Sequence, residues 1–393
     1  MIGSTLAVAM IVRDEALLLP EFLEATGPWA DQIVVADTGS TDATPAIARR
    51  AGCAVYTVPW EDDFAAARNA SLDRVTADWV LVLDADERIA AADWPKVRAL
   101  AEGPKTRCFR FVTRNYTNAA HLVEFVPCAP DDPVARGFAG WYPSTKVRLF
   151  PNGVGARFAG AVHELVNASL AGQGITIAEA PVPVHHYPLL KPAAAIRAKQ
   201  QYYLELGHRK AAAHPHDPKA HLELGAQYLE VADYPGALRA FRAALAIEPA
   251  NPAALRELGA VLHLLGRNAE ARQALELCLR YDPAQGEAWR NLGVVHAHQG
   301  AWGPAAEAFA HAVDHIPGNP DLYRMLALAH FEAQDAETAA SPARMAAGQM
   351  PHSMPACGLY AAIMNRLGRA SEARAFLEGL DTPAARDTLA RLE

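Results

Sequence analysis

The sequence predicts an α/β domain with a mainly parallel sheet, followed by an all-helical region of repeats. Within the first hundred residues, short apolar runs at 5–12, 32–36, 54–58 and 79–83 alternate with segments of helical character. This alternation is typical of crossover units and a parallel sheet. From about residue 191 the composition shifts to Ala and Leu, and small residues return every 34 positions. A period of that length indicates stacked helical repeats.

The overall composition favours a globular protein and excludes several classes. The chain has 393 residues, 51% hydrophobic and 20% charged, with a formal net charge of −8. An acidic balance argues against a general nucleic-acid binder, which needs clustered Lys and Arg. The five cysteines form no CxxC motif, so we expect reduced thiols and a cytoplasmic protein. No apolar run is long enough to span a membrane, although peripheral contact with the inner membrane stays open.

Two carboxylates end the apolar run 79–83. Asp84 and Asp86 follow it directly, in the stretch Trp-Val-Leu-Val-Leu-Asp-Ala-Asp-Glu at 79–87. Ligands of open α/β sheets bind beyond the carboxyl ends of the strands. Acidic residues there suit Mn²⁺ or Mg²⁺, with the cation bridging to a diphosphate. An Asp-x-Asp triplet arises by chance about once in a chain of this length, so its place after a buried strand carries the argument.

Two more predicted strands end in polar clusters. Residues 13–15 (Arg-Asp-Glu) follow the first strand, and 37–42 (Asp-Thr-Gly-Ser-Thr-Asp) follow the second. We expect all three clusters on one edge, where Asp37 can bind a nucleobase or ribose and Arg68, on a helix at 64–72, can reach the ligand. A capped turn, with Ser40, Thr41 or Asp42 as cap, and a solvated helix face are the plain alternatives. Neither GxGxxG nor GxxxxGK[ST] occurs.

Four ordered motifs carry a family resemblance. They are Met-Ile-Val-Arg-Asp-Glu (10–15), Val-Ala-Asp-Thr-Gly-Ser-Thr-Asp (35–42), Phe-Ala-Ala-Ala-Arg-Asn (64–69) and Leu-Asp-Ala-Asp-Glu (83–87). In this order, the first half of the chain resembles the family 2 glycosyltransferases, which have the GT-A nucleotide-diphosphosugar-binding fold. Within that family it is similar to the bacterial peptide S-glycosyltransferases.

The resemblance implies roles for these residues. Asp37 would contact the base, Arg68 would lie near the nucleotide, and the Asp-x-Asp carboxylates would hold ribose and metal. The residues expected to bind the nucleotide sugar are Arg13, Glu15, Asp37, Arg68, Asp84, Ala85 and Asp86.

Residues 101–190 supply candidates for the chemistry. Strand-like segments occur at 107–113, 121–126 and 146–150, and 127–140 reads as a surface loop in preference to a mobile lid. Inverting sugar transfer needs a base on the acceptor and a Lewis acid on the departing diphosphate. Glu164 is the candidate base, which the resemblance supports, and His163 is the runner-up. His186 is expected to join Asp84 and Asp86 on the metal, with His185 as the alternative.

Three further residues are candidates for the acceptor side, where an aromatic face or a cation would contact the incoming group. They are Trp141, Tyr116 and Arg148.

The second half of the chain has a tetratricopeptide pattern. Leu-Gly or Leu-Ala pairs recur at 224–225, 258–259, 292–293 and 326–327, with Ala at 237, 271, 305, 339 and 373, and Pro at 249, 283, 317 and 351. Units are expected to begin near 218, 252, 286, 320 and 354, after a helix from 193 to 209. Stacked units form a groove that commonly takes peptide or protein segments. Dimerisation or stabilisation alone is the alternative role.

These observations predict a GT-A domain at 1–190, a linker helix at 191–215 and a tetratricopeptide superhelix at 216–393. The expected activity is metal-dependent transfer from a nucleotide diphosphosugar, with a UDP-hexose favoured, to a protein or peptide docked with help of the repeats, and the family resemblance implies that the transfer is inverting. A lipid-linked or polysaccharide acceptor is one alternative, and a non-catalytic scaffold with a degenerate transferase domain is another. A homodimer stays open.

Overall fold

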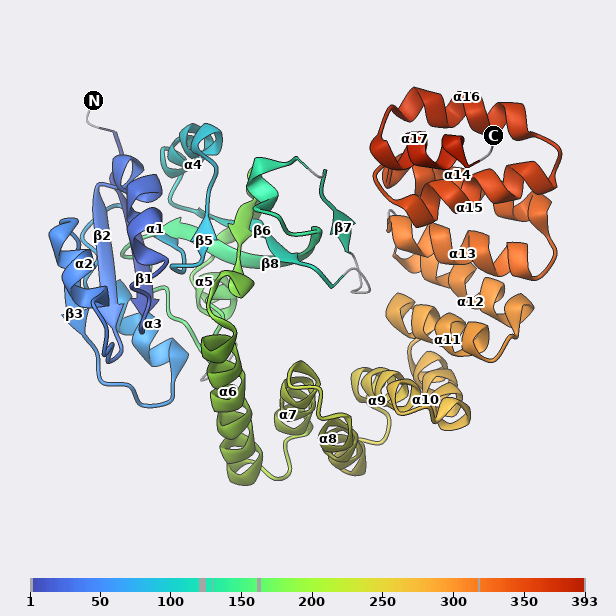
Figure 1. The fold of residues 1–393 in the computed structure, drawn as a ribbon. Helices are drawn as coiled ribbons and strands as arrows, with labels where there is room; N and C mark the ends of the chain where they lie inside the picture. Colours follow the sequence, from blue (N-terminus) through green and yellow to red (C-terminus); the bar gives the residue numbers. More distant parts are fainter. Residues whose placement is uncertain (1–2, 120–124, 130, 161–163, 317–318, 392–393) are drawn as a thin grey trace. The chain divides into compact units, whose positions relative to one another are not determined.

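The computed structural model describes residues 3–119, 125–129, 131–160, 164–316 and 319–391 (Figure 1). They form two compact units, which adjoin in the sequence between Pro192 and Ala193. The second unit also includes β7 (Val126–Pro127).

The first unit is built on one mixed sheet with the order β3-β2-β1-β4-β8-β6-β10-β5, and β9 pairs with β6. The first four strands of this order run parallel, as the alternating pattern predicts. β8 is antiparallel to both β4 and β6, and β10 is parallel to β6. The strands are β1 (Leu6–Val12), β2 (Gln32–Asp37), β3 (Ala54–Thr57), β4 (Trp79–Val82), β5 (Glu87–Arg88), β6 (Arg107–Thr117), β8 (Gly140–Pro151), β9 (Thr176–Glu179) and β10 (Val184–His186).

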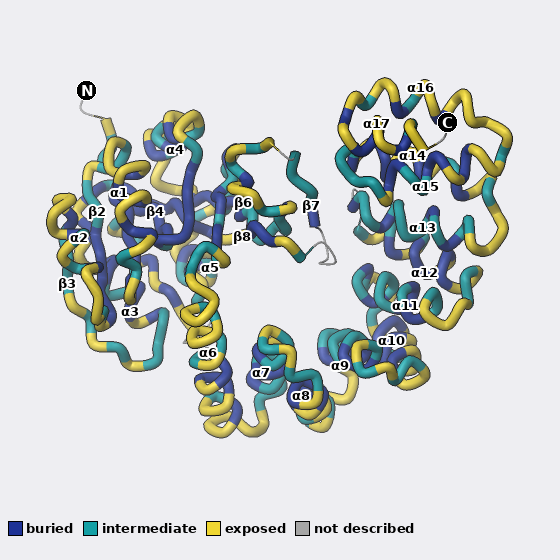
Figure 2. Tube along the Cα trace, viewed as in Figure 1, coloured by how far each residue is buried: buried dark blue, intermediate teal, exposed yellow. Residues whose placement is uncertain are grey.

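Helices cover both faces of this sheet, and its central strands are buried (Figure 2). Along β1, Val8 and Met10 pack on one face and Ala7 and Ala9 on the other. The first face is covered by α1 (Leu19–Thr26), α2 (Thr44–Arg50) and α4 (Trp94–Ala101), and the second by α3 (Phe64–Leu72) and α5 (Asn167–Gly172). Burial on both faces explains why these strands read as continuous apolar runs.

Some element boundaries differ from the sequence-based expectation. Both β6 and β8 extend several residues beyond the predicted strands, because they pair with each other along most of their length. The strand expected at 121–126 lies largely outside the described residues. The residue before α2 is Ala43, which has no side-chain cap, but Asp42 Oδ1 accepts the backbone N–H of Thr44 at 2.8 Å. One of the three predicted capping residues therefore bonds to the start of the helix. Ser40, Thr41 and Asp42 also bond to the loop after β1.

The second unit begins with α6 (Ala193–Ala213), which packs on α7, and continues as helix pairs. The first helices of the five repeats begin at the five positions that the 34-residue period predicts. The pairs are α7 (Pro218–Glu230) with α8 (Tyr234–Ile247), α9 (Pro252–Leu264) with α10 (Asn268–Tyr281), α11 (Gly286–His298) with α12 (Trp302–His315), α13 (Pro320–Glu332) with α14 (Ala336–Gln349), and α15 (Met354–Arg366) with α16 (Ala370–Leu380), followed by α17 (Pro383–Ala390).

Close helix crossings explain the repeated small residues. A Cβ atom on Gly225 would lie 2.3 Å from Cε1 of Phe241, so only glycine lets α7 approach α8 this closely. Gly259 and Gly293 meet Leu275 and Phe309 in the same way one and two units later. The recurring alanines of the second helices are fully buried. The repeat period is therefore a packing requirement of each helix pair.

Within the described part of the chain, none of the helices combines the length and the apolar character that crossing a lipid bilayer requires.

Candidate active site

The polar loops after β1, β2 and β4 lie at one edge of the sheet, because these three strands are parallel neighbours. Hydrogen bonds join the first two loops. Asp14 Oδ1 accepts from the backbone N–H of Thr41 at 2.7 Å, and the backbone N–H of Asp14 donates to Ser40 Oγ at 3.0 Å. Asp42 Oδ2 accepts from the N–H of Ala16 at 3.1 Å. We call these three loops, which follow β1, β2 and β4, the rim. Its side chains hold the first two loops together in the absence of a ligand.

Three predicted nucleotide-sugar residues lie on this rim. Asp37 ends β2, is 5% exposed, and accepts the backbone N–H of Ser40 at 3.1 Å. Glu15 forms an ion pair with Lys191, which precedes α6. Arg13 is exposed at the end of β1.

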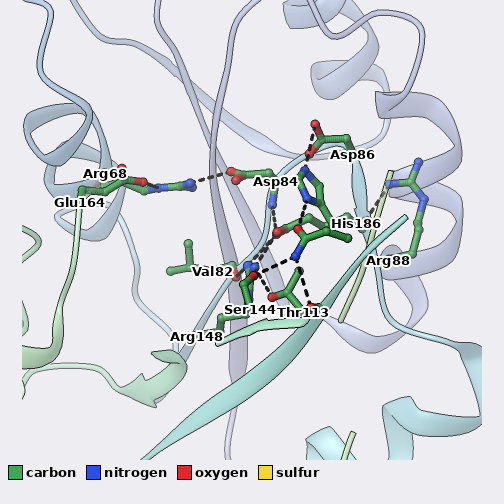
Figure 3. Close-up of polar contacts among 12 residues, drawn as sticks. Arg68, Val82, Asp84, Asp86, Arg88, Thr113, Ser144, Arg148, Glu164 and His186 are labelled. Carbon is green, nitrogen blue, oxygen red and sulfur yellow. Dashed lines mark hydrogen bonds and ion pairs between the residues drawn. The ribbon is translucent and has the colours of Figure 1, made fainter. Parts of the chain in front are cut away.

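A buried arginine joins two of the candidate carboxylates (Figure 3). Arg68 Nη2 donates to Asp84 Oδ1 at 2.7 Å, and Arg68 Nε donates to Glu164 Oε1 at 3.1 Å. Arg68 is 6% exposed, and among the described residues its buried Nη1 has no hydrogen-bond partner. These three residues line a hollow together with the exposed Lys146. The sheet thus brings together side chains that are 96 residues apart in the chain.

The charges of this hollow hold Asp84 ionised. Burial works to raise the pKa of its carboxyl group, but Arg68 and, more weakly, Lys146 lower that pKa below its ordinary value. The Nη1 group of Arg68 has no partner in the described part of the chain, so this guanidinium can still donate a hydrogen bond to an anionic group of a ligand.

The second cluster joins Asp86 with His186. His186 Nε2 lies 3.6 Å from Asp86 Oδ2, and Nδ1 of the same ring lies 2.8 Å from Asn115 Oδ1 (Figure 3). Burial disfavours the charged imidazole, yet the carboxylate of Asp86 raises the pKa of His186 above its ordinary value. Asp86 itself is 7% exposed.

His185 points away from this cluster. Its Nδ1 lies 2.9 Å from the hydroxyl oxygen of Tyr116, and its ring stacks on that of Tyr116. Burial, with a contribution from Arg114, lowers the pKa of His185 to about 4. Of the two candidate histidines, only His186 has a ring nitrogen facing Asp86.

A carboxylate oxygen and an imidazole nitrogen can together bind a divalent cation such as Mn²⁺ with help from a substrate. No group of three or more His, Cys, Asp and Glu among the described residues is arranged to hold an ion by itself. Magnesium is usually bound by one or two carboxylates together with substrate phosphates and water. Two ligands on one cation, at about 2.1 Å each, lie roughly 3–3.5 Å apart, which is close to the separation of Asp86 and His186.

Comparison with known proteins identifies both parts of the chain. Residues 7–124 match the family model described as "Glycosyl transferase family 2", and these residues include the rim and the Asp-x-Asp turn. The chain carries a glycosyltransferase family 2 domain. Residues 7–124 are therefore a transferase enzyme domain. Residues 228–294 of the second unit match the model described as "Tetratricopeptide repeat".

Curated relatives cover parts of the chain. A TPR repeat-containing protein of Synechococcus elongatus is 33% identical over 246 residues, which is 61% of this chain and 56% of the relative. An uncharacterized glycosyltransferase of Rickettsia felis is 30% identical over 81 residues, covering 21% of this chain and 28% of the relative. The chain thus spans about half or less of the length of these relatives.

Solved structures similar to the chain include several repeat proteins. A MamA structure matches with a TM-score of 0.39 and 20% identity, covering 44% of this chain and 91% of that one. A structure of pilF from Pseudomonas aeruginosa matches with a TM-score of 0.42 and 18% identity, covering 50% of this chain and 91% of that one.

Two buried residues that the sequence reasoning did not single out support the transferase domain's Asp-x-Asp turn. Glu87 accepts two hydrogen bonds from Arg148, both of 2.6 Å, and also accepts the backbone N–H of Asp84 at 2.9 Å. Arg88 donates to the backbone oxygens of Ala85 and Leu18, which joins the turn to the segment before α1. Their position directly after Asp86 was the signal that could have identified them.

Two of the three acceptor-side candidates are buried. Arg148 is 3% exposed, and its two Nη atoms donate to Glu87, Thr113 and a backbone oxygen, so it supports the Asp-x-Asp turn from inside the sheet. Tyr116 is 1% exposed, and such burial leaves it no surface for an acceptor.

The surroundings of the remaining candidate residues differ. Trp141 is half-buried, with the guanidinium of Arg114 4.7 Å from its ring centre. Ala85 is buried, and its backbone oxygen is taken by Arg88. His163 lies outside the described residues.

Proposed function

We propose that the first unit catalyses metal-dependent, inverting transfer of a sugar from a nucleotide diphosphosugar, with a UDP-hexose favoured. The single observation that carries the proposal is the pairing at one sheet edge. Asp86 and His186 lie close enough together to bind one cation. Asp84 and Glu164, which are both bonded to Arg68, line the hollow beside this pair.

The donor would lie along the rim, with the base at Asp37 and the ribose at Asp84. The loop after β1, which carries Arg13 and Glu15, borders the nucleotide in this arrangement. A divalent cation, Mn²⁺ or Mg²⁺, would be held by Asp86 and His186, with Asp84 close by, and would neutralise charge on the departing diphosphate. The family generally uses such cations. The unused Nη1 of Arg68 supports a diphosphate in the hollow, because a buried guanidinium donor without a partner is costly.

Glu164 is the proposed base, with His163 as the alternative. Its carboxylate would take the proton from the acceptor nucleophile while the nucleophile forms a bond to the anomeric carbon. The bond from that carbon to the diphosphate oxygen breaks, and the electron pair leaves with the diphosphate. Arg68 fixes the carboxylate by its 3.1 Å hydrogen bond. Attack opposite to the leaving group inverts the anomeric centre.

We further propose a protein or peptide as the acceptor, docked with help from the repeats. Stacked helical repeats present extended surfaces that suit polypeptide segments. The resemblance to the bacterial peptide S-glycosyltransferases supports the same acceptor class. The five cysteines, all among the described residues, form no disulfide, which fits the proposed cytoplasmic setting.

The test combines donor binding with matched variants. The full-length protein is screened by thermal shift against a panel of nucleotide sugars, with and without Mn²⁺, and donor hydrolysis and transfer to peptide and lipid-linked acceptors are then assayed. We expect one donor to raise the melting temperature only when Mn²⁺ is present. Asp86→Asn should abolish that shift, whereas Asp73→Asn, at an exposed ion pair with Arg157, should retain it.

Three results would change the proposal. Turnover that survives Asp86→Asn with metal present would remove the metal assignment. Transfer to the lipid-linked acceptor alone would replace the acceptor class. The absence of binding to any nucleotide sugar would favour a scaffold over an enzyme.

A further inference from the structure

Asn115 lies directly behind the imidazole of His186. It belongs to β6, where parallel pairing with β10 sets Asn115 beside His186. The side chain is 6% exposed, and its Oδ1 lies 2.8 Å from His186 Nδ1. Asn115 lies outside the four motifs of the transferase domain.

The neighbours of Asn115 on β8 determine which way its amide points. Nδ2 donates to the backbone oxygen of Tyr142 at 3.1 Å and to Ser144 Oγ at 3.0 Å (Figure 3 labels Ser144). A carbonyl oxygen only accepts hydrogen bonds, so the amide atom that faces Tyr142 must be the NH₂ group. The oxygen of the amide therefore faces His186.

The amide oxygen in turn determines the tautomer of the imidazole. An oxygen acceptor 2.8 Å from Nδ1 requires a proton on Nδ1. A neutral imidazole with its proton on Nδ1 carries its lone pair on Nε2. That nitrogen is the one that lies 3.6 Å from Asp86 Oδ2. Metal-binding histidines typically donate their other N–H to a carboxylate or carbonyl oxygen in this way.

We propose that Asn115 is a positioning residue that holds His186 in the Nδ1–H tautomer and directs the Nε2 lone pair toward a divalent cation shared with Asp86. The proposal rests on the proposed metal site of the transferase domain. In this proposal β6 and β8 support the metal site, because the hydrogen bonds of Asn115 connect both strands to His186 on β10.

Two substitutions at this position separate positioning from packing. Asn115→Leu has a similar shape but no acceptor, so His186 loses the partner that fixes its tautomer and ring orientation. Asn115→Asp keeps an oxygen for Nδ1–H but loses the donors toward Tyr142 and Ser144. Ser144→Ala is the control, because it removes one partner of the amide and leaves the bond to His186 in place.

Mn²⁺ binding to the full-length protein is measured by electron paramagnetic resonance and calorimetry with UDP present, because the proposed cation is held with help from a diphosphate. We expect Asn115→Leu to weaken Mn²⁺ binding by about 10- to 100-fold. Asn115→Asp and Ser144→Ala should bind Mn²⁺ at least about as tightly as the unmodified protein. A residue with only a structural role would make the Leu and Asp variants equally weak, and that result would overturn the proposal.

Long-range ¹H–¹⁵N spectra of the metal-free protein, recorded at a pH above the raised pKa of His186 so that its imidazole is neutral, provide a second readout, with His186→Gln assigning the signals. We expect the Nδ1–H pattern in the unmodified protein and its loss in Asn115→Leu. An Nε2–H pattern in the unmodified protein would refute the tautomer assignment. If the unmodified protein binds no Mn²⁺ even with UDP present, the proposed metal site fails, and the cation part of this inference fails with it. Normal Mn²⁺ binding by Asn115→Leu would overturn only the role of Asn115.

Discussion

The buried ion pair beneath the Asp-x-Asp turn permits a sharp prediction. Glu87 and Arg148 are 2% and 3% exposed and are joined by two hydrogen bonds of 2.6 Å. In Glu87→Gln the guanidinium stays buried but loses the opposite charge. Removing one partner of a buried pair costs about 3–5 kcal/mol, because the remaining charge is left desolvated and uncompensated. We expect a loss of unfolding free energy of about 3 kcal/mol, since glutamine still offers one oxygen.

Equilibrium unfolding in urea measures this change. Five of the seven tryptophans lie in the first unit, so their fluorescence reports mainly on the transferase domain. Glu179→Gln is the matched control, because Glu179 also pairs with an arginine, Arg110, but at the exposed surface. Exposed pairs contribute little, so this variant should unfold close to the unmodified protein. A Glu87→Gln variant that is no less stable than Glu179→Gln would refute the reasoning.

A double substitution tests what the pair is retained for. Replacing a buried ion pair by apolar side chains of similar size often restores stability. Glu87→Leu with Arg148→Met should therefore recover most of the unfolding free energy lost in the single variant. Donor binding should remain weakened, because the backbone N–H of Asp84 has lost its acceptor on Glu87. Normal donor binding by the double variant would show that the pair does not position the turn.

Three further predictions concern other parts of the chain. Gly225→Ala should destabilise the repeat unit by about 1–3 kcal/mol through overpacking, which thermal unfolding measures. In the control Gly358→Ala the new Cβ has no atom within 4 Å, so this variant should be neutral or stabilising. Burial raises the pKa of Cys278 to about 11, and Cys128 alone of the five cysteines is not buried. A thiol-reactive disulfide reagent at pH 8 should thus titrate about one thiol in the folded protein and all five in urea, and rapid reaction of several native thiols would contradict the burial. Arg68→Gln should lower turnover by about 100-fold or more while Mn²⁺ binding is retained, and turnover within tenfold of normal would remove Arg68 from the site.

Local patterns were sufficient to predict the architecture. The 34-residue period located the first helix of all five units, because each Leu-Gly pair meets a large side chain of its own helix pair, as Gly225 meets Phe241. The parallel arrangement of the first four strands follows from their alternation with helices. The same local logic predicted that the polar loops meet at one edge, and the bond from Thr41 to Asp14 is one result.

The sequence by itself therefore determined the two architectures and the edge of the sheet where polar groups gather. Only the tertiary structure decided which residues face one another there. His185 and His186 are indistinguishable by composition, but successive strand residues point to opposite faces, so the register of β10 against β6 and β5 turns His186 toward Asp86 and His185 toward Tyr116. Arg148 likewise became a buried support through its pairing with Glu87, 61 residues away. Contacts of this range depend on strand order and register, which local periodicity does not encode.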